Sequence, residues 1–96
     1  MREPAIYIMA NKKKGTLYTG VTSNLAQRVY QHKKSLYTGF TADYGCKKLV
    51  FYELHENMYS AITREKQIKA GSRKNKINLI ERMNPEWKDL YNGIVF

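Results

Sequence analysis

Residues 4–22 decide the fold, and their sequence is PAIYIMANKKKGTLYTGVT. The β-forming side chains of residues 4–10 predict a strand, and the polar run 11–15 predicts a turn that ends in glycine. Residues 16–22 can then return as a second strand. Together these three segments predict a β-hairpin at the start of the chain.

The register of this hairpin determines which side chains meet. If the turn pairs residues whose numbers add to an odd value, Tyr7 and Tyr18 share one face of the sheet. Within that rule we expect Tyr7 to pair directly with Tyr18. The same register gives two further pairs on the opposite face, Ile8 with Leu17 and Ile6 with Thr19.

Apolar periodicity and turn residues divide the rest of the chain into helices, one strand and a tail. The predicted elements are a helix over 24–34, a loop over 35–46, a strand over 47–55, helices over 58–70 and 72–84, and a tail over 85–96 that folds back. Thr22 or Ser23 can cap the first helix, and Ser72 the third. Gly71 ends the second helix. We expect Trp87 to fill the core rather than to bind a ligand.

The predicted element order is β-β-α-β-α-α, which indicates an α+β fold. A three-stranded antiparallel sheet cannot bury a face alone, so it must be flanked and covered by the helices. The chain has 96 residues, a length typical of one domain. We therefore expect a single domain over 1–96, with a core over about 5–84 and the tail over 85–96.

Charge and cysteine content restrict the function classes. The chain carries 17 Lys and Arg against 8 Asp and Glu, a net charge of +9. Such a charge predicts either affinity for a polyanion, of which nucleic acid is the commonest, or a solvated basic surface. The single cysteine, Cys46, excludes an internal disulfide and fits a reducing cytoplasm. No run approaches the ~20 apolar residues of a membrane span, and no signal peptide is visible, so we expect a cytoplasmic protein without a membrane partner.

Two polar residues of the first predicted helix can face the tyrosines. Arg28 and His32 lie four residues apart and therefore share one helical face. A guanidinium can donate two parallel charged hydrogen bonds to phosphate, so Arg28 is a candidate phosphate ligand. The alternative is a surface arginine next to a histidine that finds a partner at the helix end.

Glu65 stands inside the apolar stripe of the second predicted helix. The stripe consists of Met58, Ala61, Ile62 and Ile68. A carboxylate that turns toward the core is costly unless it is paired or binds a cation. The simplest pairing is a salt bridge with Lys69, one turn later. Because such a bridge would form equally well on the outer face of the helix, we favour a functional acid.

Motif residues at characteristic spacings occur in the first third of the chain: they are Ala5-Ile6-Tyr7, Tyr18-Thr19-Gly20, Arg28 and His32. They resemble the GIY-YIG nuclease domain, and the resemblance extends from about residue 5 to about residue 84. It is closest to the stand-alone, single-domain bacterial members. Ala5 replaces the first Gly of the family motif, and Thr19 replaces the middle Ile of the second motif. The resemblance implies the same fold and a metal-dependent endonuclease that hydrolyses phosphodiester bonds in DNA.

The resemblance also implies roles for five catalytic residues, Tyr7, Tyr18, Arg28, His32 and Glu65. Glu65 matches the family's metal-binding acid, and a lone carboxylate completed by water and substrate phosphate suits Mg²⁺ or Mn²⁺. Arg28 would hold a non-bridging phosphate oxygen. One of the two tyrosines would orient or deprotonate the attacking water, while His32 can relay that proton or contact phosphate. Which of these three is the general base stays open.

Basic and polar residues are expected to hold the DNA backbone. This set comprises Lys12, Lys13, Lys14, Gly20, Thr22, Lys69, Arg73, Lys74, Asn75, Lys76 and Asn78. Asn75 and Asn78 are alternatives for a polar residue, often Asn, that follows the family's Glu. Gly20 can admit the substrate or another backbone, and Thr22 can contact the substrate or cap a helix. Backbone contacts are independent of sequence, so we expect low specificity, or specificity for structured or branched DNA, unless a partner protein supplies targeting.

Two other functions compete with the nuclease. The net charge of +9 and the departure at Ala5 also fit a non-catalytic nucleic-acid-binding module on the same scaffold. A protein-interaction domain that has lost DNA binding is a third alternative. A second metal site at Glu53, His55 and Glu56 lacks a partner motif, and we expect ordinary polar residues at that strand end.

Overall fold

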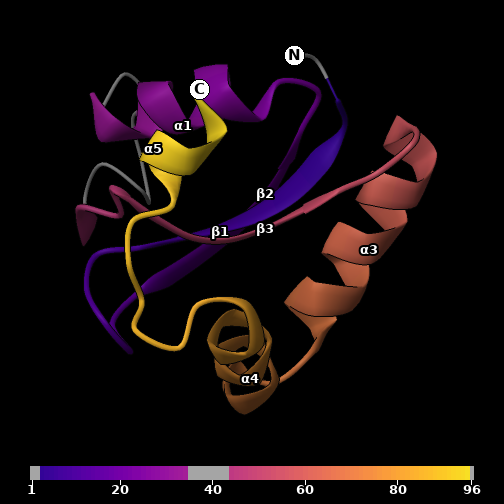
Figure 1. Cartoon of the computed structure of the whole chain (residues 1–96). Coiled ribbons are helices and arrows are strands. Elements are labelled where there is room, and N and C mark those ends of the chain that lie inside the picture. Colours follow the sequence, from indigo (N-terminus) through magenta and orange to yellow (C-terminus); the bar gives the residue numbers. More distant parts are fainter. Residues whose placement is uncertain (1–2, 35–43, 96) are drawn as a thin grey trace.

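The structure is a computed structural model that describes residues 3–34 and 44–95 (Figure 1). Its antiparallel sheet consists of β1 (Ala5–Ala10), β2 (Leu17–Thr22) and β3 (Lys48–Leu54). Its helices are α1 (Leu25–Lys33), α3 (Met58–Ala70), α4 (Arg73–Met83) and α5 (Tyr91–Ile94). The predicted α+β fold and element order are confirmed, and α5 is a short helix that the sequence did not predict.

β1 is the central strand of the sheet. The strand order is β2-β1-β3, and both neighbours run antiparallel to β1. All six residues of β1 are buried, because both of its edges are paired and helices cover both faces. Figure 1 shows α1 and α5 on one side of the sheet and α3 and α4 on the other. Tyr7 therefore faces α1 and α5, whereas its neighbour Ile8 faces α3 and α4.

Two hydrophobic clusters fill the two sides of the sheet. The cluster on the α3–α4 side contains Ile6, Ile8, Ala10, Val50, Phe51, Ala61, Ile68, Ile80 and Trp87. The cluster on the α1–α5 side contains Ala5, Tyr7, Met9, Leu25, Val29, Cys46 and Leu49. Trp87 is fully buried, so the tail folds back and its tryptophan fills the core, as the sequence predicts.

A β-bulge in β3 places two consecutive side chains on the same face. β1 pairs Ile8 with Phe51 but Met9 with Leu49, so the register shifts by one residue between these pairs. Val50 is the extra residue. Both Val50 and Phe51 can therefore join the cluster on the α3–α4 side.

The predicted register of the hairpin is wrong by two residues. Tyr7 pairs with Gly20 rather than with Tyr18. The other two predicted pairs are replaced by Ile8 with Thr19 and Ile6 with Val21. Because a shift of two keeps the odd sum, Tyr7 and Tyr18 still share one face of the sheet.

A wider turn is the physical reason for this difference. The side-chain Oδ1 of Asn11 accepts a hydrogen bond from the backbone N–H of Thr16 at 2.9 Å, which closes the hairpin further from its tip. From α4, Arg73 donates through Nη2 to the carbonyl oxygens of Lys14 and Gly15, at 2.6 and 2.7 Å. These contacts hold the turn open and attach it to the helix.

Asn24 caps α1, so the predicted caps Thr22 and Ser23 are wrong. The Asn24 side chain accepts a hydrogen bond from the backbone N–H of Gln27 at 3.2 Å. Thr22 supports this cap, because its Oγ1 accepts from the backbone N–H of Asn24 at 3.0 Å. The predicted cap of α4, Ser72, is confirmed.

Asn84 and Asp89 attach the tail to the sheet. The buried Asn84 side chain donates through Nδ2 to the carbonyl oxygens of Val50 and Lys88, at 3.1 and 2.7 Å. Asp89 Oδ1 accepts from the backbone N–H of Leu49 at 3.2 Å. These bonds cross-link residues 84–89 to β3 and thereby hold Trp87 in the core.

The remaining segment boundaries lie close to the predicted ones. Gly71 ends α3 as predicted, although its backbone is extended rather than left-handed. Of the predicted loop 35–46, residues 35–43 lie outside the described part of the chain. Among the helices that the structure describes, none is long and apolar enough to cross a membrane.

Candidate active site

Three aromatic rings from three different elements meet on the α1 side of the sheet. Tyr7 comes from β1, Tyr18 from β2 and His32 from α1. The ring centroids lie 6.3 Å apart for Tyr7–Tyr18, 5.6 Å for Tyr7–His32 and 5.4 Å for Tyr18–His32. These separations are typical of tilted aromatic packing. The three residues, hereafter the ring cluster, therefore form one contiguous group.

A hydrogen bond joins Tyr7 to His32 inside the ring cluster. The Tyr7 hydroxyl oxygen lies 2.9 Å from His32 Nε2, and the two residues are 0% and 5% exposed. Burial, assisted by the nearby charge of Arg28, lowers the pKa of His32 from 6.5 to about 4. The imidazole is therefore neutral at pH 7, and one of its ring nitrogens carries no proton.

Gly20 makes the position of Tyr7 sterically allowed. It is the direct cross-strand partner of Tyr7. A Cβ atom at position 20 would lie 2.5 Å from the Tyr7 hydroxyl oxygen and 2.6 Å from Cζ. The tyrosine ring thus extends over the bare glycine backbone. The group that approaches Gly20 is this ring, a neighbour that the sequence did not predict.

Tyr18 and Arg28 are the more accessible residues around the ring cluster. Both are partly exposed, whereas Tyr7 and His32 are buried. Arg28 lies one helical turn before His32, near enough for its charge to lower the histidine pKa. The accessible groups here are thus a phenol and a guanidinium, a pair suited to hydrogen bonding with water and phosphate.

Glu65 turns inward as predicted, but from the other side of the sheet. It lies on α3 between Ala61 and Ile68, which belong to the α3–α4 cluster, and it is only 9% exposed. Its Oε2 lies 2.8 Å from Lys69 Nζ, so the salt bridge considered from the sequence is formed. Because α3 packs against β2, the helix that carries Glu65 lies next to the strand that carries Tyr18.

The apolar stripe around Glu65 is narrower than predicted. Ala61 and Ile68 are buried, whereas Met58 and Ile62 are 36% and 38% exposed. Glu65 therefore occupies the centre of the buried face, between its two buried neighbours.

The predicted nucleic-acid-binding residues divide into engaged and exposed groups. Lys69 pairs with Glu65, Arg73 binds the hairpin turn, and Lys76 donates to the Gly71 carbonyl oxygen at 2.7 Å. Lys69 and Arg73 are nevertheless exposed, as are the remaining lysines and asparagines of the set, Lys12, Lys13, Lys14, Lys74, Asn75 and Asn78. Thr22, which is buried, does not cap α1 itself but supports the Asn24 cap by accepting a hydrogen bond from the backbone N–H of Asn24.

Comparison with known proteins identifies the family of this chain. Residues 3–78 match the family described as the GIY-YIG catalytic domain. The chain belongs to the GIY-YIG family. A UPF0213 protein from Clostridium perfringens is 39% identical over 75 residues, which cover 78% of this chain and 80% of that protein. A UPF0213 protein from Syntrophus aciditrophicus is 37% identical over 87 residues, covering 90% of this chain and 98% of that protein.

A solved structure shares the fold of this GIY-YIG chain. It is the solution NMR structure of a UPF0213 protein from Bacillus halodurans, with a TM-score of 0.57 and 24% sequence identity. The match covers 91% of this chain and 92% of that one. The resemblance to stand-alone bacterial members of the GIY-YIG family is thus confirmed.

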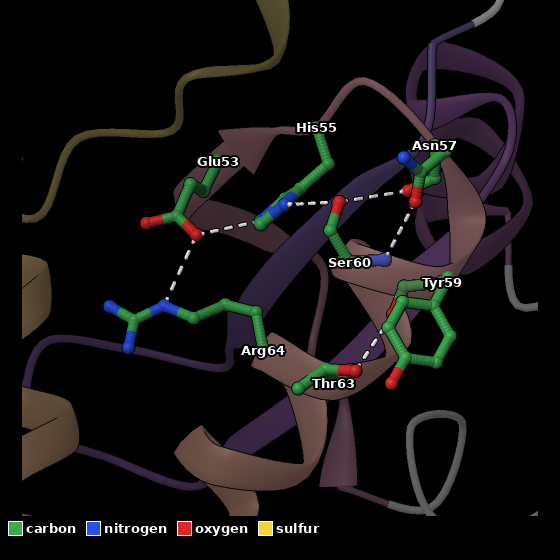
Figure 2. Close-up of polar contacts among 7 residues, drawn as sticks. All are labelled: Glu53, His55, Asn57, Tyr59, Ser60, Thr63 and Arg64. Atoms are coloured by element: carbon green, nitrogen blue, oxygen red, sulfur yellow. Dashed lines mark hydrogen bonds and ion pairs between the residues drawn. The ribbon is translucent and has the colours of Figure 1, made fainter.

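A second polar cluster of this GIY-YIG chain joins β3 to α3, as Figure 2 shows. His55 Nε2 lies 2.8 Å from Glu53 Oε1, and its Nδ1 lies 3.1 Å from Ser60 Oγ. Arg64 donates through Nε to the same Glu53 oxygen at 3.1 Å, and Ser60 Oγ donates to the Asn57 carbonyl oxygen. Since these contacts run from the strand end to the first turns of the helix, they fix the orientation of α3 on the sheet.

Sequence reasoning missed the hydrogen bond between Tyr7 and His32 and the role of Gly20 beneath the tyrosine. A glycine opposite a tyrosine in a strand pair is the signal that would have found the role of Gly20. The predicted register concealed that signal, because it placed Tyr18 rather than Gly20 opposite Tyr7. The turn contact of Asn11 was the missing information.

Proposed function

We propose that this GIY-YIG protein is a metal-dependent endonuclease that hydrolyses phosphodiester bonds in DNA. The observation that carries this proposal is the ring cluster, in which Tyr7, Tyr18 and His32 are in mutual contact next to Arg28. Membership of a nuclease-type family supports the reaction class. The net charge of +9 supports a polyanionic substrate.

Exposure suggests how the roles divide. Arg28, which is partly exposed, would bind a non-bridging phosphate oxygen and stabilise the charge that develops there. Tyr18, the more accessible phenol, would orient the attacking water by hydrogen bonding. His32 has a pKa of about 4 and holds a proton poorly at neutral pH, so we assign it to positioning Tyr7 rather than to general-base catalysis.

Glu65 is the residue that would hold Mg²⁺ or Mn²⁺. Its carboxylate supplies the hard oxygen donors that these cations prefer, with water and phosphate completing the coordination. Lys69, its present partner, is 52% exposed and can move away into solvent as the cation binds. When bound, the cation would stabilise negative charge on the phosphate oxygens. The substrate phosphate would then lie along β2, the strand that carries Tyr18 and packs against α3.

The proposed enzyme is one domain over 1–96 with little sequence specificity. Exposed lysines of the hairpin turn, Lys12, Lys13 and Lys14, would contact phosphates without reading bases. Targeting would come from DNA structure, such as a branch, or from a partner protein. The single cysteine, Cys46, is buried and unpaired, which fits a reducing cytoplasm.

Cleavage of supercoiled plasmid and branched DNA with Mg²⁺ or Mn²⁺ tests the proposal. We expect Arg28→Ala and Glu65→Ala each to lower the rate by about 100-fold or more. Lys66→Ala removes an exposed charge from the same helix as Glu65 and should leave the rate nearly unchanged. If the two site variants cleave as fast as the wild type, the assignment of these residues is wrong.

A non-catalytic nucleic-acid-binding module is the second candidate. The ion pair of Glu65 with Lys69 favours it, since one carboxylate oxygen already has a cationic partner. This alternative predicts DNA binding that weakens steeply with salt. It also predicts that the wild-type protein cleaves no substrate at any divalent-cation concentration.

A further inference from the structure

A polar cleft lies between α3 and α4, on the side of the sheet opposite the ring cluster. Its volume is about 270 Å³. Its polar lining comprises three cations and three amides: Arg64, Lys76, Arg82, Gln67, Asn75 and Asn78. The lining residues that the structure describes include no carboxylate. The cleft therefore has the electrostatic character of an anion-binding site.

Two of the three cations are held in place by contacts within the chain. Arg64 donates through Nε to Glu53 at 3.1 Å, which leaves the outer nitrogens of its guanidinium for other acceptors. Lys76 Nζ donates to the Gly71 carbonyl oxygen at 2.7 Å. Because both side chains are already ordered, a bound anion would restrict little further motion.

The third cation, Arg82, has no partner among the described residues. Arg82 forms no hydrogen bond or ion pair with any residue in the ranges 3–34 and 44–95. The same holds, within those ranges, for the side-chain amides of Gln67 and Asn78. A guanidinium suits phosphate, and an amide offers donors and an acceptor together, as the edge of a nucleobase requires.

Gly71 lines the cleft without a side chain. Its backbone is extended, with φ of −76°, a conformation that any residue can adopt. A Cβ atom there would lie 3.4 Å from the Ile68 carbonyl oxygen and 3.7 Å from Asn75 Nδ2, which are ordinary contacts. The backbone therefore does not require glycine at this position, and the missing side chain leaves space beside Asn75.

We propose that this cleft binds one nucleotide unit, with the phosphate at Arg82 and the base edge at the amides. The cleft, at about 270 Å³, is slightly smaller than the roughly 300–1,000 Å³ of common small-molecule sites, which limits its occupant to no more than one nucleotide. The nucleotide can be free or part of a DNA strand, since both present the same phosphate and base. The site is independent of cleavage, and Arg64, Gln67 and Arg82 were not among the residues predicted to bind nucleic acid.

An NMR titration of the full-length chain, without divalent cations, tests this site. The ligands are deoxyadenosine monophosphate and, separately, a short single-stranded oligonucleotide. Arg82→Gln removes the charge at the proposed phosphate position, and Lys66→Gln removes an exposed charge of α3 outside the cleft as a matched control. We expect Arg82→Gln to weaken binding about tenfold and Lys66→Gln less than twofold. A spectrum with unchanged dispersion shows that each variant is folded.

The outcomes distinguish nucleotide binding at the cleft from the proposed endonuclease activity. Weakened binding of the mononucleotide alone indicates a free nucleotide as ligand, and weakened binding of both indicates a nucleotide within a strand. No shifts around the cleft at millimolar mononucleotide, or equal losses in the two variants, would overturn the proposal. The mononucleotide-induced shifts at the cleft residues should persist in Arg28→Ala, the variant with slowed cleavage, because α1 and the cleft lie on opposite sides of the sheet.

Discussion

The two sides of the sheet hold their polar groups by different means. On the α1 side, Tyr7, Tyr18 and His32 are positioned by ring packing, and burial keeps the histidine neutral. On the α3–α4 side, Glu65 is held by an ion pair with Lys69. The first group should therefore be sensitive to changes of volume and to acid, whereas the second should respond to changes of charge. Three predictions test this contrast.

The largest effect should come from acidification of the α1 side. The pKa of His32 is about 4 in the folded chain and near 6.5 in an unfolded one. Between these values the unfolded state binds more protons, so the free energy of unfolding falls as the pH falls. Because one pH unit corresponds to about 1.4 kcal/mol, the total loss should be on the order of 3 kcal/mol.

Urea unfolding at pH 7 and pH 4.5 measures this loss. His32→Gln should remove most of the pH dependence, because the glutamine cannot be protonated. The chain has two histidines, so His55→Gln is a matched control that should keep it. Equal pH dependence in the wild type and His32→Gln would show that the ring cluster does not suppress protonation.

An added methyl group at Gly20 should have the next largest effect. Gly20→Ala forces the Tyr7 ring away from a Cβ only 2.5 Å from its hydroxyl oxygen. Overpacking of this kind costs about 1–3 kcal/mol, and the displaced hydroxyl should also lose its bond to His32. Gly93→Ala adds the same methyl group at an open position. Apart from the two chain neighbours and the backbone of its own helix, no described atom lies within 4 Å of the new Cβ atom. Equal free energies of unfolding for the two variants would contradict the position assigned to the Tyr7 ring.

The smallest effect should come from the ion pair on the α3 side. Lys69→Ala should lower the free energy of unfolding by only about 0.5 kcal/mol, because the lysine is half exposed and such helical pairs are weak. It should also increase the stabilisation gained from added Mg²⁺, since the cation no longer competes with Lys69 for Glu65. Thermal unfolding with and without MgCl₂ measures both quantities. An unchanged response to Mg²⁺ would argue that Glu65 is only a structural partner.

The sequence predicted the elements well, because their signals are local. Apolar alternation defined the strands, helical periodicity defined the helices, and Ser72 capped α4 as expected. The predictions of the hairpin register and of the α1 cap were wrong because each depends on which of several polar side chains accepts a hydrogen bond from a particular backbone N–H. The side chains of Asn11 and Asn24 accept these bonds, and a single sequence does not rank them against neighbouring Thr and Ser residues.

The candidate site was only partly predictable for a related reason. Tyr7, Tyr18 and His32 meet as expected, since face and helical spacing are properties of the sequence pattern. Their division into buried and accessible groups depends on how α1 lies on the sheet, which the pattern does not determine. The inward orientation of Glu65 follows from its position in the stripe, whereas the exposure of Met58 and Ile62 depends on the tilt of α3.

The tail contains a built-in optical reporter. Trp87 is the only tryptophan of the chain, and its buried indole donates through Nε1 to Glu81 Oε2 at 2.9 Å. Solvent polarity shifts the wavelength of indole fluorescence. Detachment of residues 85–95 should therefore shift the emission maximum of Trp87 even while the sheet stays intact. Circular dichroism follows the helices at the same time. Recording both signals in one sample distinguishes detachment of the C-terminal segment from unfolding of the whole molecule.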